Sequence, residues 1–133
     1  MVNAPSIPSV AANTWTKVGD VGSFTKSAAG SLLELTFNSR LCVNGWGPGA
    51  TGANFELRVD NTPVPSGVAR ATVVPSDNAN YGVWASITGL FTGLSAGSHT
   101  VSIWVYSYNG TAASPTVNPG NFTAPHLVVK EFK

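Results

Sequence analysis

Charged side chains are scarce in this sequence: seven Lys and Arg and six Asp and Glu make up 10% of its 133 residues. Soluble domains usually carry about 25%. The basic residues are scattered along the chain, whereas a nucleic-acid-binding protein clusters Lys and Arg to displace counterions from phosphates. The composition therefore argues against a nucleic-acid partner. It favours an oligomer, because subunit contacts use up surface that would otherwise carry charge.

Cysteine is also scarce, and long apolar runs are absent. Cys42 is the single cysteine, which excludes an intramolecular disulfide, and the apolar run around it predicts a buried, unreactive thiol. No run of about 18 apolar residues is present, so we expect no membrane insertion. The first residues lack the positive and apolar regions of a secretion signal. Export is therefore expected to depend on a larger particle, on lysis or on a fusion partner.

The length is that of one domain with a single core. Pro5 and Pro8, among small residues, predict an extended N-terminal arm over residues 1–13. Residues 14–133 are then expected to form one folded domain.

No segment of helical length shows 3.6-residue periodicity, and alternation with period 2 takes its place. Short strands are predicted over residues 15–18, 21–26, 32–43, 55–60, 68–74, 83–92, 99–108 and 126–132. Glycine-rich or proline-rich connections, including 45–54 and 109–121, separate them. This pattern predicts an all-β antiparallel sandwich or barrel, jelly roll or immunoglobulin-like, and the single cysteine excludes the Cys-Trp-Cys immunoglobulin pattern.

The strand over residues 99–108 has two different faces. Val101, Ile103 and Val105 form the apolar face that a sandwich core needs. The opposite face carries the aromatic residues Trp104, Tyr106 and Tyr108. Such a face is covered by a second copy of the chain, by a loop or by a ligand.

Three segments in this order carry a resemblance to a known family: FELRVDN at residues 55–61, GLSAGSHTVSIWV at 93–105 and HLVVKEF at 126–132. From about residue 15 to the end, the chain resembles a TNF-like jelly roll of the bacterial and phage type, related to the complement globular head. The resemblance implies a sandwich of about eight to ten strands, a homotrimer and a role in binding or display. Stalked members of the family carry a Gly-X-Y repeat, which this chain lacks.

Catalysis and metal binding find little support in the residue pattern. His99 and His126 lie far apart and lack metal-like spacing, and the strand carboxylates lie beside arginines, where ion pairing is expected. Asp60 and Asp77, with neighbouring Asn residues, supply oxygen atoms without the spacing of a calcium loop. We therefore expect no enzyme, no catalytic residue and no cofactor, with calcium as the one ion that the family resemblance leaves open.

Two sets of residues are candidates for binding. Aromatic rings stack on sugar faces while amides bond to hydroxyls, and this chemistry is offered by Trp46, Asn80, Tyr81, Tyr108 and Asn109. Aromatic residues are also enriched at subunit interfaces, and the predicted trimer interface consists of Trp84, Trp104, Tyr106, Glu56 and Arg58.

These expectations combine into a non-enzymatic, trimeric module of a phage or bacterial particle, located on a virion or an extracellular appendage. Its leading role is the receptor-binding head of a tail fibre or appendage, which recognises a cell-surface glycan or protein. One alternative is a trimeric capsid decoration or cement protein anchored by the N-terminal arm. A second is a monomeric carbohydrate-binding module.

We expect light scattering of the purified protein to give about three times the chain mass of 13.7 kDa, because a TNF-like head assembles as a homotrimer. A clean monomer would contradict the trimer and favour the carbohydrate-binding module.

Overall fold

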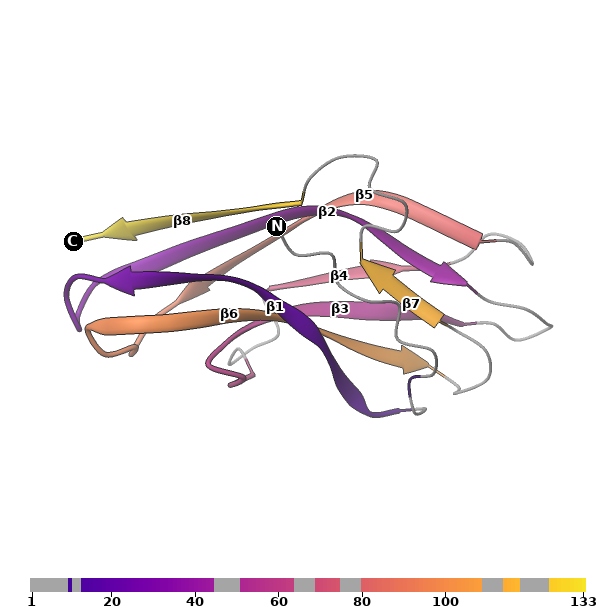
Figure 1. Cartoon of the computed structure of the whole chain (residues 1–133), viewed down its shortest axis with the longest axis horizontal. Helices are drawn as coiled ribbons and strands as arrows, with labels where there is room; N and C mark the ends of the chain where they lie inside the picture. The colour runs from indigo at the N-terminus through magenta and orange to yellow at the C-terminus, as the bar shows by residue number, and fades with distance from the viewer. Residues whose placement is uncertain are drawn as a thin grey trace.

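The computed structural model describes residues 10, 13–44, 51–63, 69–74, 80–108, 114–117 and 125–133, and every regular element in them is a β-strand. In chain order the strands are β1 (Trp15–Lys26), β2 (Leu32–Asn44), β3 (Thr51–Val59), β4 (Arg70–Val73), β5 (Asn80–Phe91), β6 (Gly97–Tyr108), β7 (Ser114–Val117) and β8 (His126–Phe132). They form two antiparallel sheets that lie one over the other as a β-sandwich (Figure 1).

Each sheet combines strands that are distant in sequence. Sheet A has the order β1-β6-β3-β4, and sheet B has the order β5-β2-β7, with β8 also paired to β2. The strands β7 and β8 follow one another along the same edge of β2, because β7 pairs with residues 41–44 and β8 with residues 32–38. In Figure 1 the yellow β8 lies beside β2 and β5 in one layer, and β1, β6 and β3 lie in the other.

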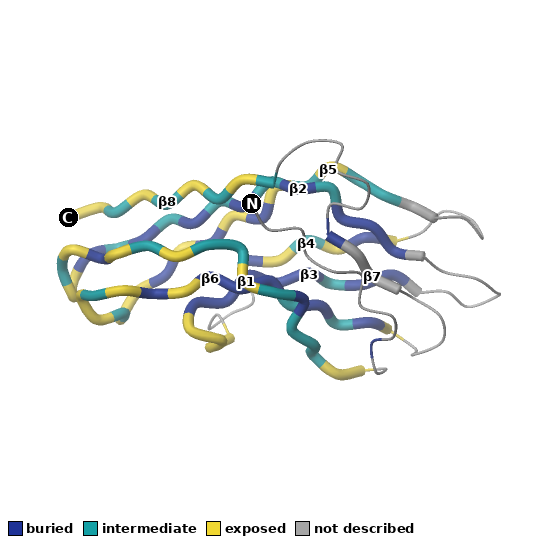
Figure 2. Tube along the Cα trace, in the orientation of Figure 1, coloured by how far each residue is buried: buried dark blue, intermediate teal, exposed yellow. Residues whose placement is uncertain are grey.

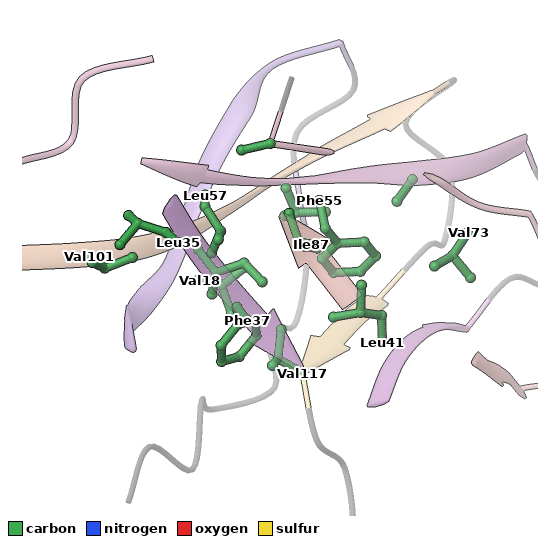
Figure 3. Close-up of a cluster of buried hydrophobic side chains, with 14 of the residues drawn as sticks. Val18, Leu35, Phe37, Leu41, Phe55, Leu57, Val73, Ile87, Val101 and Val117 are labelled. Carbon is green, nitrogen blue, oxygen red and sulfur yellow. The ribbon is translucent and has the colours of Figure 1, made fainter. Parts of the chain in front are cut away.

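The core is built by the alternation of the long strands. Phe37 on β2 and Phe55 on β3 are 2% and 0% exposed, and burying one such side chain stabilises the fold by roughly 1.5–3 kcal/mol. Figure 3 shows side chains from both layers meeting between the sheets, among them Val18, Leu35, Leu41, Leu57, Val73, Ile87, Val101 and Val117. Figure 2 shows β3 largely buried and β2 alternating between buried and half-buried, whereas the residues of β8 alternate between exposed and half-buried.

The structure corrects three of the predicted strands. Two strands were expected on either side of Gly19 and Asp20, but β1 runs through them, with register shifts against β6 that place bulges there. Strand β3 begins at Thr51, inside the predicted loop 45–54, and Gly52 is required because a Cβ there would lie 2.0 Å from the backbone oxygen of Val73. Of the segment predicted as a strand over residues 68–74, the described residues 69–74 form a strand over Arg70–Val73.

Strand β7 is absent from the sequence-based prediction, which placed a loop over residues 109–121. It contains Pro115, which cannot donate a hydrogen bond, and it lies at an edge of sheet B, where proline is tolerated. Val117 at its end is 2% exposed and belongs to the core.

Part of the predicted N-terminal arm lies against the sandwich. Val10 is 5% exposed within the core cluster, and the backbone N–H of Asn13 donates to the oxygen of Ser107 over 3.0 Å. The other residues of the segment 1–12 lie outside the described residues. Cys42 is buried, as predicted. In the part of the chain that the structure describes, no helix is long and apolar enough to span a membrane.

The C-terminal strand is fastened to the turn between β1 and β2. The Glu131 carboxylate accepts hydrogen bonds from the backbone N–H groups of Ser27 and Ala28 and from the hydroxyls of Ser27 and Ser31. These donors, the Ser31 hydroxyl first, lower the pKa of Glu131 to about 2. Beside them, Lys26 is 1% exposed and its ammonium donates to the carbonyl oxygen of Ala28. Strand β8 is thus held along its length by its ladder with β2 and near its C-terminal end by this carboxylate.

The turn after β3 is fastened to the start of β6. Asp60 and Asn61 have φ of 50° and 62°, a conformation that Asp and Asn tolerate better than most residues. Asp60 Oδ2 lies 2.7 Å from His99 Nδ1, and His99 Nε2 lies 3.0 Å from the carbonyl oxygen of Ser95. A carboxylate and a carbonyl both accept, so both ring nitrogens donate and the imidazole is held in its charged form. The hydrogen bond to Asp60 raises the pKa of His99, and the same bond lowers the pKa of Asp60.

This pair predicts how stability depends on pH. Its contribution is complete between the unshifted pKa of Asp60, 3.8, and that of His99, 6.5, and it is lost as the pH rises through the raised pKa of His99 or falls through the lowered pKa of Asp60. We expect the free energy of unfolding in urea to fall by about 1 kcal/mol between pH 6 and alkaline pH, the value of one half-exposed charged hydrogen bond.

His99→Gln should remove this fall, and His126→Gln is the matched control. His126 is exposed and bonds Asn38 in sheet B. If the free energy of unfolding still falls at alkaline pH in His99→Gln, or no longer falls in His126→Gln, the pH dependence does not come from the Asp60–His99 pair.

Candidate functional site

Polar and aromatic side chains gather on the outer face of sheet A, opposite the core. The register between its strands arranges them in three rows across the sheet. The rows are Trp15, Tyr106, Asn54 and Thr72; then Lys17, Trp104, Glu56 and Arg70; then Asp20, Ser102 and Arg58. The strands contribute alternate residues, because the neighbours in sequence point into the core, and a bulge in β1 shifts this alternation between Lys17 and Asp20.

Glu56 occupies the centre of this face and is 0% exposed. Its Oε1 accepts a hydrogen bond from Arg58 Nε over 2.7 Å, and its Oε2 accepts one from Arg70 Nε over 2.5 Å. Both carboxylate oxygens are therefore paired, which a buried charge requires. One carboxylate and two guanidinium groups leave the cluster with a net charge of +1.

Tryptophan rings cover the ion cluster. The guanidinium carbon of Arg58 lies 4.2 Å from the centre of the Trp104 ring and 5.1 Å from that of Trp15, and the guanidinium carbon of Arg70 lies 5.0 Å from the Trp15 ring. These are distances of cation–π contact. Trp104 is held in place by its Nε1–H, which donates to the Ser102 hydroxyl over 2.9 Å. The rings explain how a carboxylate on an outer sheet face is fully buried.

A cleft of about 180 Å³ lies next to the ion cluster, lined by Trp15, Asn54, Arg70, Tyr106 and Tyr108. The rings of Trp15 and Tyr106 are 5.4 Å apart and tilted by 51°, and those of Tyr106 and Tyr108 are 5.2 Å apart at 73°. Such geometries are favourable for aromatic pairs. The cleft therefore has a wall of three rings in contact, with an amide and a guanidinium beside it.

Hydrogen bonds position the polar groups of the cleft. The Asn54 amide donates to the Tyr108 hydroxyl over 2.6 Å, and its oxygen accepts from the Thr72 hydroxyl over 2.7 Å. The Tyr106 hydroxyl donates to the side-chain oxygen of Asn13 over 3.3 Å. A site whose side chains are already held loses less conformational entropy when a ligand binds.

The structure brings part of the predicted ligand set to this cleft. Tyr108 lines it and is 42% exposed. Asn80 and Tyr81 belong to sheet B, where their backbones pair with Asn44 and Val43. Trp46 and Asn109 lie outside the described residues.

Four of the five residues predicted at a trimer interface share one surface, since Glu56, Arg58, Trp104 and Tyr106 all lie on the outer face of sheet A. Trp84 lies on sheet B opposite Arg40 and is 53% exposed. The five residues therefore do not form a single surface patch.

Three residues of the cleft were missed from the sequence. Asn54 fell in the predicted loop 45–54, Arg70 was assigned to a strand without a role, and Trp15 was noted only as a strand start. The sole sequence signal for any of the three was Trp15 itself, a tryptophan at the first position of a predicted strand. Their convergence depends on β6 lying between β1 and β3, which local patterns do not specify.

Among the described residues, no group of three or more His, Cys, Asp or Glu side chains is placed to hold a metal ion. Comparison of the chain with family models, with curated proteins and with solved structures finds no match. The TNF-like resemblance therefore remains a prediction.

The ion cluster predicts a strong effect of a nearly isosteric substitution. Glu56→Gln leaves the Arg58 guanidinium covered by tryptophan without a counter-charge, so we expect the free energy of unfolding to fall by about 3 kcal/mol. Urea denaturation monitored by tryptophan fluorescence measures this change.

Glu34→Gln is the matched control, because Glu34 pairs with Lys130 over 2.8 Å on the exposed face of sheet B. That exposed pair is expected to contribute less than about 1 kcal/mol. Equal effects of the two substitutions would show that Glu56 is not a buried charge.

Proposed function

We propose that this protein is a non-enzymatic jelly-roll module that binds carbohydrate on the outer face of sheet A, as the receptor-binding head of a phage or bacterial particle. The observation that carries the proposal is the cleft, in which three aromatic rings lie beside the Asn54 amide and the Arg70 guanidinium. Rings stack on the C–H faces of sugars, and fixed polar groups bond to hydroxyls. The particle context comes from the resemblance to TNF-like heads.

The nesting of the strand pairs supports a jelly roll. Strand β1 pairs with β6, β2 with β5 and β3 with β4, as in a long hairpin rolled into two sheets. Strands β7 and β8 follow this roll and extend sheet B beyond β2. They are an addition to the nested pairs.

The state of Glu56 supports binding over hydrolysis. A glycosidase needs a carboxyl group that can exchange a proton with its substrate, usually with a second carboxylate nearby. Glu56 is inaccessible, and both of its oxygens are occupied by guanidinium groups. The residues that line the cleft include no carboxylate.

The trimeric decoration protein is the second candidate, and the outer face of sheet B favours it. Trp84, Leu90 and Phe132 are about half exposed there, and Val128 is 40% exposed. Contacts between subunits or with a capsid would remove these apolar side chains from water. In this candidate the anchoring arm is limited to residues before Val10, since Val10 belongs to the core.

Replacing one ring of the cleft tests the leading proposal. A glycan array identifies bound sugars, and calorimetric titration with the strongest of them then gives the affinity. We expect Trp15→Ala to weaken binding about tenfold or more, because an aromatic platform at the centre of a site is worth over 1 kcal/mol.

Trp84→Ala is the matched control, since it removes an equally large ring from the outer face of sheet B. It should leave the affinity unchanged. Loss of binding in Trp84→Ala alone would move the site to sheet B, and an array on which no glycan binds would reject carbohydrate binding.

A further inference from the structure

We infer that the sugar bound on the outer face of sheet A carries a carboxylate group and that Arg70 recognises it. This inference rests on the proposed function and specifies its ligand class. Uronic acids and sialic acids share the required chemistry.

The excess positive charge of the ion cluster is accessible at Arg70. Glu56 neutralises one of its two arginine partners, and the side chain of Arg58 is 7% exposed under the tryptophan rings. The side chain of Arg70 is 39% exposed and lines the cleft. The uncompensated charge can therefore reach a ligand only through Arg70.

Arg70 has hydrogen-bond donors beyond the one that it uses on Glu56. A guanidinium has five N–H groups, and Arg70 uses Nε on Glu56. Within the described part of the chain, no acceptor bonds to its terminal nitrogens. Those nitrogens present a planar pair of donors, which matches the two oxygens of a carboxylate.

The charge of Arg70 lies close to the aromatic rings on which a sugar would stack. The guanidinium of Arg70 lies 5.0 Å from the Trp15 ring, and both side chains line the same cleft. A sugar ring stacked on Trp15 or Tyr106 therefore places a carboxylate substituent within reach of Arg70. A volume of about 180 Å³ is below the roughly 300–1,000 Å³ of sites for drug-sized ligands, so the cleft fits one sugar unit of a longer glycan.

Binding over Arg70 is more favourable for a carboxylated sugar than for a neutral one. A neutral sugar that covers Arg70 removes water from a cation and supplies only hydroxyl groups in return. A carboxylate replaces that water with a charge-assisted pair of hydrogen bonds, which are about twice as strong as neutral ones. Lys17, in the next row of the same face, is paired with Asp20 over 2.7 Å and adds no net charge.

Calorimetric titration of the full chain with matched sugars tests the inference. The probes are trigalacturonate against galactotriose, and sialyllactose against lactose, each at low and high salt. We expect the carboxylated member of one pair to bind about tenfold more tightly or better, with a preference that salt weakens. The two pairs distinguish uronic from sialic acids.

Arg70→Gln is expected to abolish the preference, so that the carboxylated sugar binds no more tightly than its neutral partner. Arg70→Lys keeps the charge without the planar fork and should retain part of the preference. Lys130→Gln is the matched control: it removes one charge from an ion pair on sheet B and should change nothing. Thermal unfolding shows whether each variant is folded. If Arg70→Gln does not fold, the comparison of sugars on the unsubstituted protein still tests the inference.

The outcomes separate this inference from the proposed function. Equal affinity for charged and neutral sugars overturns the inference and leaves carbohydrate binding in place. A preference that persists in Arg70→Gln overturns the role of Arg70. If no probe binds and an array of neutral and acidic glycans is also negative, carbohydrate binding itself fails, and the inference fails with it.

Discussion

A carboxylate with no contact to solvent constrains the whole outer face of sheet A. A buried charge that loses its partners is strongly destabilising, so Glu56 depends on both arginines, and tryptophan rings lie over both guanidinium groups. The ion pair between Glu56 and Arg70 also joins β3 to β4 across the sheet. One buried charge therefore sets the positions of Arg70 and Trp15, which both line the cleft.

The two outer faces of the sandwich differ in organisation. Sheet A carries a connected network of rings, amides and guanidinium groups that hold one another in place. Sheet B carries separate apolar side chains beside an exposed ion pair between Glu34 and Lys130. A preorganised polar network suits a ligand with defined hydroxyl and carboxylate positions, whereas scattered apolar groups suit contact with another protein surface.

Strand positions were largely predictable, because period-2 alternation reports which face of a strand meets the core. The alternation of Val101, Ile103 and Val105 with the aromatic residues is present as expected in β6. The prediction of strands failed where local sequence and tertiary context disagree. Glycine and aspartate in β1 suggested a break that bulges absorb, and the proline of β7 suggested a loop although that strand has a partner in β2. For the site, Tyr106 and Tyr108 were predicted on one aromatic face and both line the cleft, but Trp15, Asn54 and Arg70 were not found from the sequence.

The sequence by itself determined the all-β class, the faces of the strands and the presence of an aromatic surface, since these depend on side-chain order along single strands. Only the tertiary structure decided which strands are neighbours. Residues 15, 54, 70, 106 and 108 come from four strands, and the pairing of β6 with both β1 and β3 brings them together. That pairing is settled by burial of the core as a whole, a property that no local pattern encodes.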